Sequence, residues 1–450
     1  MGIMYLIAAL RQAGHECDYF SVVWDKRDVV RYVGATQPDI IAYSACTGMH
    51  KFYLDLNARL KEQHRFLSLF GGFHPTFCPE MIHKEGVDVL CRGEGEQAVV
   101  DLADRLQRGE DITAIAGLWV RRDGKIHENP MRPRIEDLDS LCVPDRELVY
   151  RYRALRDNGM KCFMIARGCP YRCSYCFNDG LNRLYGDRGK GFRLRSVDSV
   201  VRELADVKAT YGVRYFKSYD DTFTLDKAWL EEFAARYGTE VGVPFRCNAR
   251  VNLLDEEVVG LLKKAGCYLV AIGVETGSVE LRNSVLNRNL SDAQIIRACA
   301  LLKSAGIGIV SENMIGFPGD TLDTAFQTME LNGKLGVDYP NCFLFQPFPS
   351  AALSGSAAAQ GYFDGDFDRI DERGMFNSTI LALEQKRELE NLQRLFAVGV
   401  RFPAFRRAIR ELIRLPLKPL YTIPYLLYGG YKGFRLRAFE PSCRIVMERI

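Results

Sequence analysis

The feature that most constrains this chain is a group of three cysteines in the segment RGCPYRCSYCFN, residues 167–178. Cys169, Cys173 and Cys176 have the spacing C-x3-C-x2-C, and the segment follows CFMIARG, an apolar run that predicts a buried strand. Gly168 and Pro170 suit a loop that turns tightly. The three thiols therefore lie in one loop at the end of a strand, where they can bind one metal centre.

A group of three thiols restricts the kind of metal site. A structural zinc ion takes four ligands, and the next cysteines in the sequence are Cys162 and Cys247. A four-iron cluster also takes four ligands, and three from the protein leave one iron open to a substrate or cofactor. We favour the cluster, with a zinc ion that recruits a distant ligand and a chance group of buried thiols as the alternatives.

The composition predicts a globular cytoplasmic protein. Hydrophobic residues make up 47% and charged residues 26% of the 450 positions, and the net charge is +3. No uncharged run of about 18 apolar residues predicts a membrane span, and the first residues lack the pattern of a secretory signal. The fourteen cysteines are therefore expected to be reduced. All six histidines precede residue 128, so the cysteine region works without histidine.

Helical and strand patterns alternate along most of the chain, which predicts an α/β protein. Residues 1–125 predict a doubly wound, Rossmann-like domain with a hairpin turn at Asp123–Gly124, and a linker follows over 126–158. Six strand–helix units within 159–375 predict a partial (β/α)6 barrel of the TIM type, and 376–450 predicts a helical extension. The barrel strands are expected at 162–166, 213–218, 244–249, 268–274, 308–316 and 341–347.

The cysteine segment resembles the signature of the radical S-adenosylmethionine superfamily, in which Tyr175 is the aromatic residue before the last cysteine. The resemblance implies that the cysteines hold a [4Fe-4S] cluster whose open iron binds S-adenosylmethionine. Reductive cleavage of that molecule then gives a 5′-deoxyadenosyl radical, with an electron from a donor such as flavodoxin or ferredoxin. A radical abstracts hydrogen directly, which explains how a barrel without histidine is chemically sufficient.

The resemblance continues to about residue 350 and implies a set of S-adenosylmethionine contacts at the strand ends. FKSYDDTF, CNARV, VAIGVETGS and ENMIGFPGDT carry them in the family's order. Asp220, with Asp221 beside it, has a turn or helix-cap role as its alternative. Glu275 lies deep in an apolar strand and needs a partner. The implied S-adenosylmethionine residues are Tyr175, Asp220, Asn248, Arg250, Glu275, Gly316, Pro318 and Gly319.

The first 125 residues resemble the cobalamin-binding domain of one branch of that superfamily. The resemblance implies that a corrinoid lies on the strand ends, but the D-x-H-x-x-G signature of an axial histidine is absent. Relatives have one more strand ahead of GIMYLIAAL, so we expect a gap in the sheet there. His74 has a second interpretation, as a loop histidine that bonds to the backbone. The implied corrinoid residues are Ser44, Thr47, Gly48, Gly71, Gly72, His74, Gly93 and Glu94.

The segment 401–437 mixes arginine and lysine with large apolar residues. A basic amphipathic helix at 403–414 predicts contact with a membrane surface. The alternative is a helix packed on the barrel with its arginines exposed. Pro416, Pro419 and Pro424 are expected to break any longer helix.

These patterns predict a cobalamin-dependent radical S-adenosylmethionine enzyme that methylates an unactivated carbon of a small molecule or lipid. A radical cyclase or rearrangement enzyme of the same architecture is the first alternative, with lipid, tetrapyrrole or natural-product substrates. A methylthiotransferase acting on RNA and a corrinoid carrier without catalysis are less favoured. A methylthiotransferase would need a second cysteine trio, and we expect no nucleic-acid partner.

Overall fold

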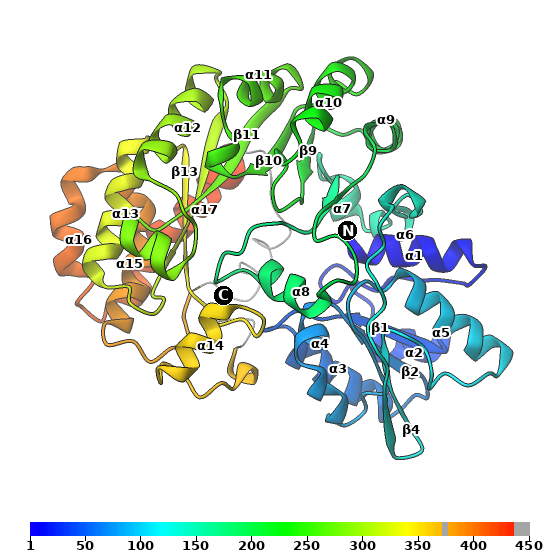
Figure 1. Cartoon of the computed structure of the whole chain (residues 1–450). Helices are drawn as coiled ribbons and strands as arrows, with labels where there is room; N and C mark the ends of the chain where they lie inside the picture. Colours follow the sequence, from blue (N-terminus) through cyan, green and yellow to red (C-terminus); the bar gives the residue numbers. More distant parts are fainter. Residues whose placement is uncertain (371–376, 436–450) are drawn as a thin grey trace.

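The structure of the protein is a computed structural model that describes residues 1–370 and 377–435. It contains two large sheets, each covered by helices, and the chain between them crosses from one to the other (Figure 1). Helix α8 (Phe177–Tyr185), which follows the cysteine segment, lies between the two sheets in Figure 1. The cysteine loop is therefore central in the molecule.

The N-terminal sheet is doubly wound, as predicted. Its order is β1-β2-β3-β4-β5, with β1 to β3 parallel and β4 and β5 antiparallel. β1 forms one edge of the sheet, and no strand of the described chain pairs with its outer side. The strands are β1 (Ile40–Ser44), β2 (Leu67–Gly71), β3 (Val89–Cys91), β4 (Leu118–Arg122) and β5 (Lys125–Glu128).

Apolar residues of both sheet faces build two separate cores. Successive side chains of a strand point to opposite faces, so Phe70 joins one core and its neighbour Leu69 the other. The first core lies under α2 (Val29–Thr36) and α3 (His50–Lys61). The second lies under α1 (Gly2–Gln12) and α5 (Glu96–Arg108). Because both faces are covered, the parallel strands β1 to β3 are mainly apolar rather than alternating.

The predicted hairpin turn is confirmed at Asp123–Gly124, where φ is +50° and +74°. Positive φ at both central residues matches the twist of the flanking strands. The hairpin extends further than expected, because β5 ends at Glu128, three residues into the predicted linker. Backbone pairing with β4 continues to this point, with Trp119 opposite Glu128.

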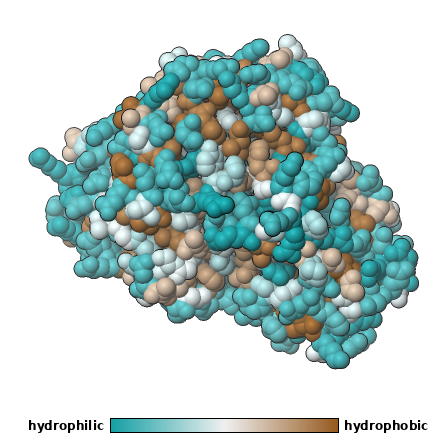
Figure 2. Space-filling view, in the orientation of Figure 1, coloured by the Kyte–Doolittle hydropathy of each residue, from teal (hydrophilic) through white to brown (hydrophobic). Residues whose placement is uncertain are grey.

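The second sheet is the predicted partial barrel. Its six parallel strands lie in chain order, and the two outer strands β6 and β13 do not pair with each other. Helices α9 (Val197–Tyr211), α10 (Lys227–Glu240), α11 (Glu256–Lys264), α12 (Asp292–Ser304) and α13 (Leu322–Leu335) cover its outside (Figure 1). In the same orientation, Figure 2 shows hydrophobic residues gathered where Figure 1 places β9 to β11. The strands are β6 (Met160–Phe163), β9 (Tyr215–Ser218), β10 (Phe245–Ala249), β11 (Cys267–Glu275), β12 (Gly308–Ile315) and β13 (Tyr339–Leu344).

The segment predicted as a linker is packed against the barrel by a buried ion-pair triad. Arg146 donates from Nη2 to Oε1 of Glu203 on α9 at 2.5 Å, and Arg195 donates from Nη1 to Oε2 at the same distance. All three side chains are buried. Two short helices, α6 (Glu147–Tyr150) and α7 (Arg153–Arg156), also form here.

The C-terminal part is helical, with α14 (Ala352–Ala359), α15 (Lys386–Arg401), α16 (Arg406–Leu412) and α17 (Lys418–Arg435). The expectation that prolines break a longer helix holds at Pro416, which lies between α16 and α17, and is wrong at Pro424, through which α17 continues. Pro419 lies in its first turn, where the missing N–H costs nothing. Buried Tyr421 and the bond from Tyr428 Oη to the Pro340 carbonyl (3.3 Å) hold α17 on the barrel. Cys443 and residues 436–437 lie outside the described residues.

No helix of the described chain combines the length and the hydropathy that crossing a bilayer requires. This agrees with the absence of a long apolar run in the sequence.

The buried triad generates a stability prediction. Glu203→Gln leaves two buried arginines without a counter-charge, so we expect the free energy of unfolding to fall by about 3–5 kcal/mol. Chemical denaturation followed by circular dichroism measures it. Glu232→Gln, on an exposed face of α10, is the matched control and should stay within about 0.5 kcal/mol. An equal effect of the two substitutions would contradict the role of the triad.

Candidate active site

The three cysteines lie in the loop between β7 (Ala166–Arg167) and α8. Cys169 and Cys173 are buried, and Cys176 is half-buried. Gly168 has a φ of +86°, and a Cβ there would lie 1.9 Å from the Gly191 carbonyl oxygen, so the loop requires glycine. Ser174 fixes the middle of the loop by donating from Oγ to the Val285 carbonyl at 2.6 Å.

The thiols of the loop can bind a metal that takes the place of their protons. Burial raises the pKa of Cys169, and it raises the pKa of Cys176 to about 12. Both groups therefore stay protonated until a cation displaces the proton. Their sulfurs, with that of Cys173, are not all within 4.8 Å of one another in the described structure.

Asp220 holds the strand end that precedes the cysteine loop. Its Oδ1 accepts from the N–H groups of Ile165 (2.9 Å) and Ala166 (2.8 Å), and Ser218 donates to Oδ2. Burial raises the pKa of Asp220 to about 6. Asn248 in turn donates to the Asp220 carbonyl at 2.8 Å. Asp220 and Asn248, both predicted to contact S-adenosylmethionine, thus bond to backbone groups here, and their contact with a ligand stays a prediction.

Glu275 ends β11 in a conformation that few residues other than glycine adopt, with a φ of +64°. Its Oε1 accepts from Tyr175 Oη at 2.8 Å and from Arg288 Nη1 at 3.3 Å. Arg288 also donates to Tyr175 Oη at 2.8 Å. Burial first, and then Glu275, raise the pKa of Tyr175 well above its usual value. The structure therefore joins two predicted residues through Arg288, which the sequence analysis missed.

The Gly316–Gly319 turn follows β12, with φ of +75° and +85° at its two glycines. Asp320 closes it by accepting from the Gly316 N–H at 2.7 Å, and burial raises the pKa of Asp320 to about 6. Phe317 belongs to a buried cluster against which Tyr175 packs. The turn, with Pro318 in it, therefore lies beside the aromatic residue of the cysteine loop.

Arg250, at the end of β10, points at the cysteine loop. Its Nη1 donates to Cys173 Sγ at 3.5 Å, and its Nη2 donates to the Arg288 carbonyl. Its Nε and that of Arg288 are buried without a hydrogen-bond partner. A bound carboxylate is the kind of group that would satisfy such donors.

An ion-pair junction, made of Glu94, Glu96, Arg167 and Arg193, connects the cysteine loop to the N-terminal domain. Arg167 donates to Glu96 at 2.5 Å, and Arg193 contacts Glu94 at 2.8 Å. A Cβ on Gly93 would lie 2.3 Å from Tyr185 Oη on α8. Gly93 and Glu94 were predicted to contact a corrinoid. In the structure they contact the barrel domain, and the corrinoid contact stays a prediction.

The other predicted corrinoid residues lie at the ends of β1 and β2. Ser44 ends β1. Gly72 has a φ of +103°, and a Cβ added there would collide with the backbone of Ala45. Phe73, 46% exposed, contacts the ring of Phe177 with centroids 4.3 Å apart. Because Phe177 directly follows Cys176, this face of the N-terminal domain approaches the cysteine loop.

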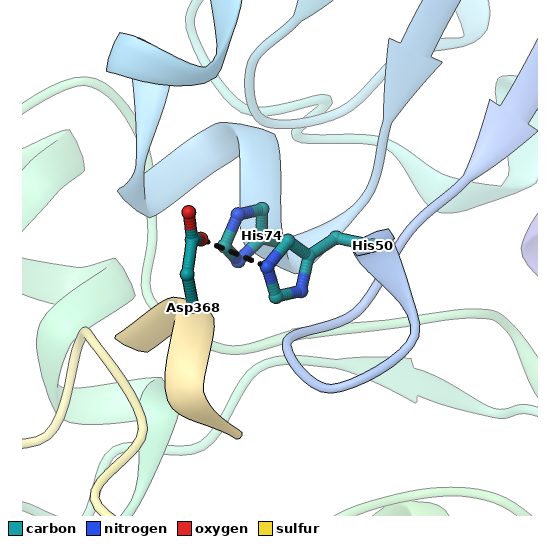
Figure 3. A group of neighbouring side chains, drawn as sticks. All are labelled: His50, His74 and Asp368. Atoms are coloured by element: carbon teal, nitrogen blue, oxygen red, sulfur yellow. Dashed lines mark hydrogen bonds and ion pairs between the residues drawn. The ribbon is translucent and has the colours of Figure 1, made fainter. Parts of the chain in front are cut away.

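His74, beside Thr47 and Gly48, belongs to a contact that we name the Asp368 clamp, of which Figure 3 shows His50, His74 and Asp368. The ring of His74 stacks on His50 at 3.7 Å, and its Nδ1 bonds to Thr47 Oγ1 at 3.0 Å. His50 Nδ1 accepts from the Gly48 N–H at 3.2 Å, so Nε2 carries the proton and donates to Asp368 Oδ1 at 3.0 Å. The clamp consists of His50, His74, Lys51, Lys84 and Asp368.

The clamp has ligand atoms close enough for a metal ion, since those of His50, His74 and Asp368 lie within 4.8 Å of one another. The position is filled by the proton on His50 Nε2 and by Lys84, whose Nζ contacts Asp368 Oδ2 at 2.9 Å. Burial lowers the pKa of His74 to about 3, so the ring is neutral. Its bond to a side chain also differs from the backbone bond predicted as its second interpretation.

Comparison with known proteins gives two family matches. The model of the Radical SAM superfamily matches residues 163–331, and that of the B12 binding domain matches residues 1–103. Both matches fall on the sheets described above.

The three individual relatives described next each share less than 30% sequence identity with this chain. The uncharacterized methyltransferase PH0819 of Pyrococcus horikoshii is 28% identical over 361 residues, which are 78% of this chain and 77% of the relative. The anaerobic magnesium-protoporphyrin IX monomethyl ester cyclase of Rubrivivax gelatinosus is 27% identical over 78% of this chain and 65% of its own length. The structure of TsrM from Kitasatospora setae with cobalamin and a [4Fe-4S] cluster has a TM-score of 0.64 at 19% identity, covering 80% of this chain and 72% of that one. This last likeness shows the fold.

The neutral state of His74 predicts a pH dependence of stability. The pKa of His74 falls from 6.5 in an unfolded chain to about 3 in the fold. Between these two pH values the unfolded state therefore binds a proton at His74 that the folded state does not bind. We expect the free energy of unfolding to decline as the pH falls from 6.5 towards 3, more steeply than in His74→Asn. Urea titrations at several pH values measure the difference. The two proteins should run parallel above pH 6.5, and equal slopes below it would refute the assignment.

Proposed function

The chain belongs to the radical S-adenosylmethionine superfamily, in the branch that carries a B12 binding domain, and we propose that it methylates an unactivated carbon of a small-molecule or lipid substrate. The observation that carries the proposal is the loop of Cys169, Cys173 and Cys176. The loop bonds to Arg250 at the end of barrel strand β10, and Phe177 next to it contacts Phe73 of the N-terminal domain. When bound, the cluster and S-adenosylmethionine supply a 5′-deoxyadenosyl radical, and a corrinoid supplies the methyl group.

The residues around the loop fit S-adenosylmethionine. Glu275 presents a fixed carboxylate to hydroxyl or ammonium groups, and Tyr175 and Arg288 hold it in place. The unpaired Nε atom of Arg288 suits a carboxylate. The Gly316–Gly319 turn offers backbone that a flat base can approach, because neither glycine carries a side chain. We assign these residues to binding and orientation, with no proton transfer.

The face formed by Thr47, Gly48 and 71–74 fits a corrinoid in two respects. Gly48 and Gly72 have positive φ near the strand ends, and Phe73 brings this face to the cysteine loop. The D-x-H-x-x-G signature of an axial histidine is absent from the sequence, and His74 is buried with its ring stacked on His50. We therefore propose that cobalamin binds here without a histidine ligand.

A cyclase of the same architecture is the second candidate, favoured by the likeness to the Rubrivivax enzyme over 78% of this chain. Both candidates need an external electron donor, for which flavodoxin or ferredoxin is suited. S-adenosylmethionine with a deuterated methyl group separates the two candidates. A methyltransferase moves the label into the product, whereas a cyclase does not.

The cluster assignment is tested by replacing each loop cysteine with alanine. Each change removes one of three ligands, so we expect the iron content to fall from about four per chain to near zero and 5′-deoxyadenosine formation to stop. Iron analysis, visible absorbance and chromatography measure this after anaerobic reconstitution. Cys142→Ala, outside the loop, is the control and should match the unmodified protein. Full iron content in the loop variants, or stoichiometric zinc in place of iron, would disprove the assignment.

We propose further that the protein contacts a membrane through a C-terminal apolar surface. Of the fifteen exposed large hydrophobic residues in the described chain, nine lie between 402 and 431. Exposed Arg401, Arg407, Arg414 and Lys418 lie among them and suit the phosphates of anionic lipids. The surface consists of Phe402, Phe405, Leu412, Leu415, Leu417, Leu420, Ile423, Leu427 and Tyr431.

The membrane proposal predicts a loss of binding when the surface is made polar. Leu420→Ser combined with Leu427→Ser removes two side chains that are 57% and 69% exposed, so folding should be unaffected. We expect at least a tenfold weaker co-sedimentation with vesicles of phosphatidylglycerol and phosphatidylcholine. Val143→Ser with Ile296→Ser, exposed elsewhere, is the matched control. Equal binding by all three proteins, or none by the unmodified one, would refute the proposal.

A further inference from the structure

Arg250 is the one side chain in the described structure shown to donate a charged hydrogen bond to a cysteine of the loop. Its Nη1 lies 3.5 Å from Cys173 Sγ. Cys176 Sγ receives a neutral donor instead, Asn178 Nδ2 at 3.8 Å. The three sulfurs therefore have different surroundings, and Cys173 has the most positive one.

The position of the guanidinium is fixed by the loop itself. Its plane lies over the ring of Tyr171, 4.0 Å from the centroid, and its Nη2 donates to the Arg288 carbonyl. Tyr171 is held in turn by Asn252, which donates from Nδ2 to the phenol oxygen at 3.2 Å. Arg250 is also 92% buried by its surroundings, so water screens its charge weakly. These contacts hold a full positive charge beside one sulfur.

A cation that donates to a ligand sulfur favours the more negative state of a metal centre. Reduction adds an electron to an iron–sulfur cluster, and hydrogen bonds to its sulfurs raise its reduction potential. Charge-assisted bonds are the stronger kind, and they strengthen further where the dielectric constant is low. The electron comes from the external donor and, in the absence of S-adenosylmethionine, remains on the cluster, and no proton is transferred at Arg250.

We propose that Arg250 is a positioning residue that raises the reduction potential of the cluster through its hydrogen bond to Cys173. The proposal rests on the proposed function, in which the cysteine loop holds that cluster. It replaces the sequence-based role of Arg250 as a direct contact of S-adenosylmethionine. In physical terms, Arg250 makes the cluster easier to reduce by the donor.

The test is a redox titration of the reconstituted full chain, followed by electron paramagnetic resonance in the absence of S-adenosylmethionine. Arg250→Gln removes the charge and should lower the midpoint potential by at least about 59 mV, which is a tenfold change for a one-electron couple. Arg250→Lys keeps the charge but not the planar fork, so its potential should lie between the two. Arg172→Gln is the matched control, because Arg172 adjoins Cys173 but is exposed. Its potential should stay near that of the unmodified protein.

The outcomes are separable. An Arg250→Gln cluster with normal iron content and an unchanged potential overturns the proposal, as does an equal shift in Arg172→Gln. An unchanged potential with weaker S-adenosylmethionine binding would restore the direct-contact role. Where Arg250→Gln fails to assemble, Arg250→Met replaces it, since its unbranched stem still covers Tyr171, and the same shift is required. Failure of the unmodified chain to hold iron refutes the proposed function instead.

Discussion

The ion-pair junction is the contact on which the arrangement of the site depends. Arg167 immediately precedes the cysteine loop, and its guanidinium is held by Glu96 at the start of α5. This contact ties the loop to the N-terminal sheet, alongside the ring contact of Phe73 with Phe177. All four side chains of the junction are at most 16% exposed, so breaking one pair leaves a charge that water reaches poorly. The two domains are therefore held at one mutual orientation, with the strand ends of both directed at the loop.

A second set of contacts makes the loop and the barrel strands one rigid unit. Hydrogen bonds run from Cys173 through Arg250 to the Arg288 backbone, and from the Arg288 side chain to Tyr175 and Glu275. The left-handed backbone at Glu275 costs about 1–3 kcal/mol and persists because these partners hold it. Strain of this kind is a sign of function, since a more relaxed conformation would turn the carboxylate elsewhere. The cysteine loop and the Glu275 carboxylate thus share one scaffold.

The sequence predicted the local features of the site well and its long-range partners poorly. Strand positions and the hairpin at Asp123–Gly124 follow from short patterns, and so does the cysteine loop, whose ligands lie within a few residues. Glu275 was expected to need a partner, but nothing in its surroundings specified Arg288, which a separate loop supplies. Asp220 was equally ambiguous, because a carboxylate after a strand can bind ligand or backbone. The length of α17 was missed because tertiary anchors outweigh the cost of Pro424.

The Asp368 clamp has a consequence for the order in which the molecule is completed. It joins residues 318 positions apart, and its two histidines lie in the N-terminal sheet domain, which ends at Glu128. During translation the chain is synthesised at about 5–20 residues per second, and domains fold in order from the N-terminus. Asp368 is therefore synthesised roughly 10–50 seconds after the last strand of that sheet. Through this interval the strand ends beside His74 carry no clamp. A nascent chain therefore has a period in which a large ligand can settle on this face before the later segment closes over it.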